Sequence, residues 1–272
     1  MAPRSDTAFI VFDTESVPDG ALISRVLYPG EALSPAAALS RFEEEIAADQ
    51  PERKPFIPVS FQVPVAIGVA RVGSDYRLRD VACLDAPRFE PQEMVKLFWR
   101  GVEHYSEASL VTFNGRGFDL PLLTLAAFRF GVSSPRYFND PDRFGFRYRF
   151  GTKHLDLLDW LTEYGACRMK GGLNLLAKML GKPGKMETKG DQVAKLHAHG
   201  KVEEINDYCL HDVLDTYFVF LRTLVLMGSL DLEAEQRLVA ETRSWLEERA
   251  AGQPALGRYL EGFGSWNPAP FV

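Results

Sequence analysis

The stretch Ala8-Phe9-Ile10-Val11-Phe12-Asp13-Thr14-Glu15 places five apolar residues directly before a pair of carboxylates. The apolar run is short and rich in strand formers, so it predicts a buried β-strand that ends at Asp13. Side chains at positions i and i+2 of a strand point to the same face, so Asp13 and Glu15 are expected side by side. The alternative is a surface turn, where acidic residues are common.

Two neighbouring carboxylates repel each other, and each raises the proton affinity of the other. A divalent cation removes that cost, and oxygen ligands suit hard ions such as Mg²⁺ or Mn²⁺. The carboxyl ends of strands commonly carry functional sites in α/β proteins. Asp13 and Glu15 are therefore candidate metal ligands.

The rest of the chain predicts an α/β fold, a sandwich of helices around a mixed central sheet. Residues 63–72 and 76–84 flank the turn signal Gly73-Ser74-Asp75 and predict a hairpin. Short strands are expected at 110–113 and 154–157, and helices at about 35–48, 91–104, 120–130, 173–181, 190–199, 202–227 and 233–250. The end of the chain, 252–272, is expected to be irregular because it contains Gly and Pro.

Carboxylates gather in two further segments. In Thr112-Phe113-Asn114-Gly115-Arg116-Gly117-Phe118-Asp119, Asp119 opens a helix and is either an N-cap or a holder of metal-bound water. In Tyr208-Cys209-Leu210-His211-Asp212, Tyr208 and Asp212 lie four residues apart and share one helix face. Such a pair is commonly a structural hydrogen bond. His211 points elsewhere and is expected to pack or to face solvent.

The segments FDTES, FNGRGFDLPLL and YCLHD together resemble the three motifs of the DEDD 3′→5′ exonucleases. The YxxxD form of the third segment resembles the tyrosine (DEDDy) subgroup, since Asp207 occupies the position where the histidine subgroup has His. Within the class, the chain is most similar to stand-alone proteins related to the proofreading domain of family B DNA polymerases. The resemblance covers about residues 8–226, a motif-bearing core that a C-terminal helix and tail at 230–272 follow. One domain is expected over 1–272.

The resemblance implies an RNase H-like fold and two divalent cations, Mg²⁺ or Mn²⁺, that clamp the scissile phosphate. It implies that Asp13, Glu15 and Asp212 hold the metal that activates water. Asp13 would also touch the second metal, and Asp119 would act through water. Tyr208, whose reference pKa is about 10, is implied to orient the water rather than to act as a base. The products would be nucleoside 5′-monophosphates.

Three residues of the second motif, Asn114, Gly115 and Phe118, are candidates for binding the terminal nucleotide. Phe118 would stack on a base or, alternatively, pack in the core. Asp156 resembles a companion residue that supports the site. Residues 166–201 contain eight Lys or Arg and two acids, Glu187 and Asp191. This basic segment is expected either to guide a strand or to form a solvated surface, with an exposed loop at 182–185.

Composition narrows the possible partners. The net charge of −6 argues against extensive duplex binding, so the expected partner is the 3′ end of a single strand, with DNA preferred. No signal peptide or membrane span is expected, and the three separated cysteines favour the cytoplasm. An exoribonuclease with the same centre and a catalytically silent nucleic-acid-binding module remain alternatives. A dinucleotide-binding enzyme is disfavoured, because acids instead of GxGxxG follow the first strand.

Overall fold

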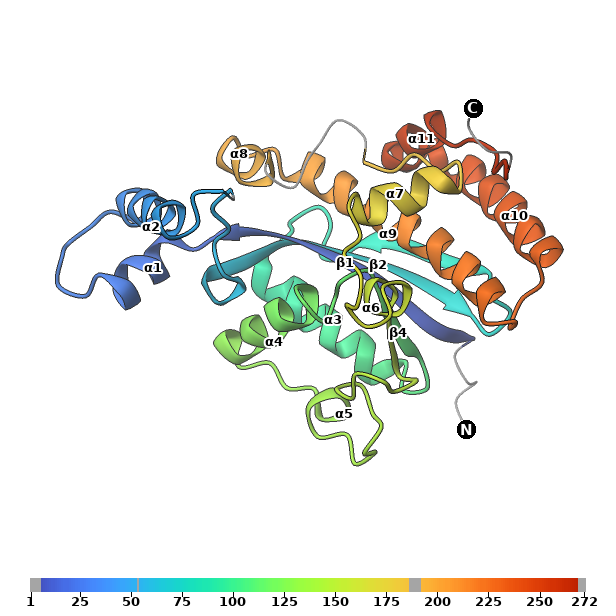
Figure 1. Cartoon of the computed structure of the whole chain (residues 1–272), viewed down its shortest axis with the longest axis horizontal. Coiled ribbons are helices and arrows are strands. Elements are labelled where there is room, and N and C mark those ends of the chain that lie inside the picture. The colour runs from blue at the N-terminus through green and yellow to red at the C-terminus, as the bar shows by residue number, and fades with distance from the viewer. Residues whose placement is uncertain (1–5, 53, 186–191, 269–272) are drawn as a thin grey trace.

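The protein is described by a computed structural model that covers residues 6–52, 54–185 and 192–268. Within these residues, strands form one sheet in the order β3-β2-β1-β4-β5 (Figure 1). Their bounds are β1 (Thr7–Pro18), β2 (Gln62–Gly73), β3 (Leu78–Cys83), β4 (Ser109–Thr112) and β5 (His154–Asp156). The β1–β2 and β2–β3 pairs are antiparallel, whereas β1–β4 and β4–β5 are parallel. The predicted mixed central sheet is confirmed.

The first strand is longer than predicted. It continues to Pro18, because β2 pairs with it beyond Asp13 through partners such as Asp13↔Gly68 and Glu15↔Ala66. The two carboxylates therefore lie inside a strand and not after its end. The short β4 pairs with β1 only over Phe9–Val11. In the described structure, β4 therefore leaves the edge of β1 open where the carboxylates begin.

Helices cover both faces of the sheet (Figure 1). The helices are α1 (Gly20–Leu27), α2 (Pro35–Asp49), α3 (Pro91–His104), α4 (Asp119–Phe130), α5 (Pro135–Phe138), α6 (Leu157–Leu161), α7 (Gly172–Met179), α8 (Val193–Ala198), α9 (Val202–Leu226), α10 (Leu232–Ala250) and α11 (Pro254–Glu261), with a 3₁₀ turn η1 (Val59–Phe61). Ile10 and Phe12 join the core beneath α3 and α4, while Val11 joins the core beneath α9. The alternation of β1 thus directs its odd-numbered residues toward α9.

Each predicted helix has a counterpart in the structure, and the described residues contain four further helices that were not predicted: α1, α5, α6 and α11. The prediction that 252–272 is irregular is wrong for Pro254–Glu261, because Pro254 starts α11 instead of ending a helix, and it agrees with the irregular residues 263–268. Residues 269–272 lie outside the described residues. Ala255, Leu256 and Tyr259 of this helix are buried against the core beneath α9. In the predicted helix 190–199, residues 190 and 191 lie outside the described residues.

After Asp13 the chain completes β1 and then forms α1 and α2, and α2 corresponds to the helix predicted at about 35–48. These two helices lie at one end of the molecule (Figure 1). They share a small core with the segment before η1, centred on Ile23, Tyr28, Ala38 and Ile57. We call α1 and α2 with this core the α1–α2 lobe. Arg129 of α4 forms an ion pair with Asp19, with 2.6 Å between nitrogen and oxygen, and this contact connects the lobe to the rest of the protein.

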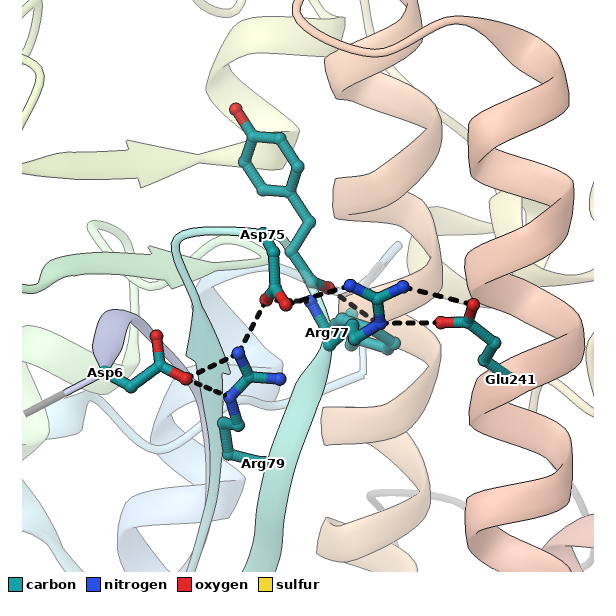
Figure 2. Close-up of polar contacts among 7 residues, drawn as sticks. Asp6, Asp75, Arg77, Arg79 and Glu241 are labelled. Atoms are coloured by element: carbon teal, nitrogen blue, oxygen red, sulfur yellow. Dashed lines mark hydrogen bonds and ion pairs between the residues drawn. The ribbon is translucent and has the colours of Figure 1, made fainter.

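Ion pairs hold the β2–β3 turn in place (Figure 2). Arg77 contacts Asp75 at 3.0 Å and Glu241 of α10 at 2.8 Å. Arg79 contacts Asp75 at 2.8 Å and also Asp6, just before β1. We call these five residues the hairpin ion network. Tyr76 has a left-handed φ of 64°, which explains why β3 begins at Leu78 and not at the predicted Tyr76.

Candidate metal centre

The centre forms where β1 meets α9. Asp13 and Glu15 project from β1, and Asp212 projects from α9, so that one carboxylate oxygen from each lies within 4.8 Å of the others. We call these three residues the carboxylate cluster. A Cβ atom on Gly68, the β2 partner of Asp13, would lie 2.9 Å from Val213 of α9. Glycine is therefore required there for α9 to approach the sheet closely enough to bring Asp212 to Asp13 and Glu15.

The third motif presents two different faces of α9. Tyr208 and Asp212 are one turn apart on the same face of α9, and the Tyr208 hydroxyl acts on the Asp212 carboxyl in the direction that lowers its pKa. Both residues are buried, at 5% and 7% exposure. His211 turns away, and its Nε2 lies 2.8 Å from the Ala255 carbonyl of α11. The prediction that His211 packs outside the centre is confirmed, and this contact anchors the motif helix to α11.

Asp119 lies close to the carboxylate cluster without belonging to it. It is the first residue of α4 and is 3% exposed, and Phe118 occupies the N-cap position before it. Thr14, between Asp13 and Glu15 on β1, donates a hydrogen bond of 2.6 Å to Asp119 Oδ1. The simple N-cap reading therefore does not account for Asp119. The first and second motifs are joined through this threonine.

The turn before Asp119 is held by Asp156, the predicted supporting residue. Its two carboxylate oxygens accept hydrogen bonds from the backbone N–H groups of Asn114 and Arg116, each at 2.9 Å. Asn114 has a left-handed φ of 66° and its side chain is exposed. Gly115 is buried, and a Cβ there would meet Thr112 Oγ1 at 2.4 Å, so the turn requires glycine. Asp156 thus shapes the turn that presents Asn114.

Burial and like charge dominate the electrostatics. Burial is the main cause that raises the pKa of Asp13, with Asp119, Asp212 and Glu15 adding to it, and burial followed by Asp212 raises the pKa of Glu15. Burial also raises the pKa of Asp119 to about 7 and that of Asp212 to about 6. Burial next to these carboxylates raises the pKa of Tyr208 far above its usual value, so its hydroxyl stays protonated. Such a cluster of buried oxygen donors fits a divalent cation, which would favour the charged carboxylates.

Two residues near the centre were not predicted. Lys185 lies with Nζ 5.6 Å from the centre of the Tyr208 ring, and its charge lowers the pKa of Asp13, Glu15 and Asp212. Phe56 is 61% exposed and pairs with the half-buried Phe118, with 6.2 Å between ring centres. Lys185 is part of the predicted basic segment. The position of Phe56 could not be predicted from the sequence, because packing against α1 and α2 positions the loop that contains it.

The basic segment differs from its prediction in one respect. The loop 182–185 is not exposed as a whole: Lys182 is 3% exposed, its Nζ lies 3.9 Å from the centre of the Phe263 ring, and burial lowers its pKa to about 8. Only Lys185 in this loop is exposed. Lys189, Glu187 and Asp191 of the segment lie outside the described residues.

Comparison with known proteins places the chain in a family. Residues 54–263 match the family described as predicted 3′-5′ exonucleases related to the exonuclease domain of PolB, and the chain belongs to this family. The matched stretch contains the second and third motifs and begins after Asp13 and Glu15. The predicted relationship to the family B polymerase proofreading domain is thereby confirmed. No curated protein is significantly similar to the chain in sequence.

A solved structure supports the fold. The family B DNA polymerase from the hyperthermophilic archaeon Pyrobaculum calidifontis superposes with a TM-score of 0.50 over 90% of this chain, at 15% sequence identity. The chain spans 29% of the length of that polymerase. The α/β architecture expected from the motifs, an RNase H-like fold, agrees with this likeness.

Proposed function

We propose that the protein is a metal-dependent 3′→5′ exonuclease that removes nucleoside 5′-monophosphates from the 3′ end of single-stranded nucleic acid, with DNA preferred. The observation that carries the proposal is the carboxylate cluster, with Tyr208 one helical turn from Asp212 on α9. Family membership supports the same reaction class. We assign the reaction to one exonuclease domain over 1–272 and place it in the cytoplasm.

Each residue of the candidate centre is assigned a role according to its position. Asp13, Glu15 and Asp212 are assigned as ligands, and Asp119, held apart by Thr14, is assigned a contact through water. Two divalent cations held there would activate water and stabilise the leaving 3′ oxygen. Tyr208 keeps its proton, so its hydroxyl can orient the attacking water through a hydrogen bond but cannot serve as a base at neutral pH.

The nucleotide itself would be held by groups next to the cluster. The exposed amide of Asn114 can hydrogen-bond a sugar or a phosphate, and Gly115 allows its turn to approach the ligand. Phe118 with Phe56 offers rings for a terminal base. Lys185 supplies positive charge beside Tyr208, suited to a phosphate oxygen. These assignments are part of the proposal.

One assay tests the function. Strands of identical sequence, DNA and RNA, are labelled at the 5′ end and incubated with Mg²⁺, with Mn²⁺ or with EDTA. We expect a ladder that shortens from the 3′ end with metal only, runs faster on single strands than on blunt duplex, and slows with a 3′-phosphate. A faster RNA ladder would make the protein an exoribonuclease. Equal cleavage of circular strands would refute the exonuclease assignment, and binding without cleavage would indicate a silent module.

A further inference from the structure

Four aromatic rings outside the centre form a continuous exposed row, which we call the aromatic strip: Phe144, Tyr148, Phe150 and Tyr164. Their exposed fractions are 52%, 39%, 57% and 40%. Successive ring centres lie 5.1, 5.8 and 4.7 Å apart. A contiguous exposed apolar patch of this kind marks an interaction site. No function has yet been assigned to these rings.

Arginines alternate with the rings of the strip. Arg143, Arg147 and Arg149 are all exposed, and residues 143–155 contain no acidic residue. Arg149 is held by Asp159, at 2.8 and 2.9 Å, and also contacts the Tyr164 carbonyl at 3.0 Å. Arg143 lies 5.6 Å from the Phe144 ring centre. Among the described residues, neither Arg143 nor Arg147 forms an ion pair with a carboxylate, so both guanidinium groups can meet an external anion.

A groove of about 690 Å³ lies beside the second motif and beside two arginines that alternate with the rings of the strip. Its lining includes Asn114 and Gly117 of the motif, Arg147 and Arg149, and the carboxylates of Asp156 and Asp159. Arg116 reaches across, and its Nη2 donates a hydrogen bond of 3.1 Å to the Tyr148 carbonyl. The strip is therefore fixed to the same turn that leads into Asp119. A chain leaving the centre past Asn114 can follow this groove.

We infer that the aromatic strip binds a single strand of nucleic acid, with bases stacked on its rings and phosphates beside Arg143 and Arg147. The inference rests on the proposed function and extends it to nucleotides beyond the terminal one. Planar rings beside unpaired guanidinium groups match the alternation of bases and phosphates, and stacking accepts any base. Arg149 and Lys153 are paired with Asp159 and Asp140, so the positive charge available to a phosphate comes from Arg143 and Arg147.

Binding is tested on the full chain in EDTA, so that no strand is cut, using the fluorescence anisotropy of a labelled 20-nucleotide single strand. Tyr148→Ala combined with Phe150→Ala should weaken affinity about tenfold or more. Tyr148→Phe combined with Phe150→Tyr keeps both rings and should bind like the parent.

The arginines are tested by the salt dependence of binding. Arg143→Ala combined with Arg147→Ala should lower the slope of log affinity against log salt concentration by roughly 0.7 for each lost phosphate contact. Phe128→Ala, at an 88% exposed ring on α4, and Arg100→Ala on α3 are the matched controls and should change neither quantity.

Kinetics with metal separate this inference from the proposed function. If the strip holds upstream nucleotides, its alanine variant should raise KM for the 20-nucleotide strand relative to KM for a trinucleotide by about fivefold or more, because the short strand cannot span both sites. An active enzyme whose strip variant matches the parent in affinity and in this ratio would overturn the inference alone and leave the strip to a protein partner. A parent chain that neither binds nor shortens any strand would overturn both.

Discussion

Two groups of charged side chains in this protein are built in opposite ways. The hairpin ion network lies at the surface, and each of its carboxylates has a guanidinium partner, as between Arg77 and Glu241, which are 51% and 47% exposed (Figure 2). In the carboxylate cluster Asp212 is buried and Asp13 and Glu15 are half-buried, and their carboxylates lie close to one another. Lys185 lies nearby, but its charge does not outweigh the burial.

The difference shows which group serves the fold and which serves chemistry. Exposed ion pairs contribute little to the free energy of unfolding, typically about 0–1 kcal/mol, and they do not destabilise the folded state. Buried like charges make the folded state less favourable unless protons or a cation neutralise them. The carboxylate cluster, whose members we propose as metal ligands, is therefore expected to destabilise the metal-free protein. Four predictions test this contrast.

The largest effect is expected from Asp13→Asn. Removing one ligand charge should lower the exonuclease rate about 10³-fold, since several kcal/mol of transition-state stabilisation depend on the ions. The same change relieves repulsion and should raise the melting temperature of the metal-free protein by about 2–4 °C, equivalent to about 1 kcal/mol. Rates and melting in EDTA are measured together. Asp75→Asn in the hairpin ion network is the control and should leave the rate unchanged. A destabilised, fully active Asp13→Asn protein would contradict the contrast.

Tyr208→Phe should lower the rate about 10²-fold, the lower end for a positioning group. The ring is retained, so folding and Mn²⁺ binding should persist. Tyr217→Phe is the matched control on the same helix: its hydroxyl donates to the Tyr76 carbonyl at 2.9 Å, away from the carboxylate cluster. His211→Ala is a poorer control, because His211 is buried and bonded to Ala255. Equal losses in the two Tyr→Phe variants would show that Tyr208 is merely structural.

A smaller effect is expected from pH. Burial raises the pKa of Asp119 to about 7 and of Asp212 to about 6, whereas both groups titrate near 3.9 in the unfolded chain. The folded state then binds more protons between pH of about 4 and 7, so this contribution to stability falls as pH rises through that window. The melting advantage of Asp13→Asn over the parent in EDTA should therefore widen from pH 5 to pH 8. Mn²⁺ should stabilise the parent more at pH 8 than at pH 5, since protons compete with the ion. Mn²⁺ stabilisation that is independent of pH would contradict this linkage.

The smallest effect is expected from Arg77→Ala. It removes the contacts with Asp75 and Glu241, yet unfolding should become easier by only about 1 kcal/mol or less. The difference from the parent should shrink in 0.5 M NaCl because salt screens exposed charges. Denaturant midpoints at two salt concentrations measure it, and the exonuclease rate should not change. A decrease of several kcal/mol in the free energy of unfolding would show that the hairpin ion network contributes strongly to the stability of the fold.

The sequence alone determined the local chemistry. The alternation of β1 places Asp13 and Glu15 on one face, and the four-residue spacing on α9 places Tyr208 with Asp212, because both periods are fixed by backbone geometry. The mixed sheet followed from the order of strand and helix signals. The alternation of arginine with aromatic residues at 143–150 is also visible in the sequence.

Only the tertiary structure decided how the parts meet. Phe146 in the same alternating segment is 1% exposed while Phe144 is 52% exposed, and no local pattern separates them. The continuation of β1 past its apolar run depends on the pairing of β2, and α11 depends on the surface of α9 that it covers. Asp119 stands apart from the carboxylate cluster because Thr14 holds it, and Lys185 reaches Tyr208 from a distant loop. Contacts between segments far apart in the chain are set by packing of the whole fold, which residue spacing does not encode.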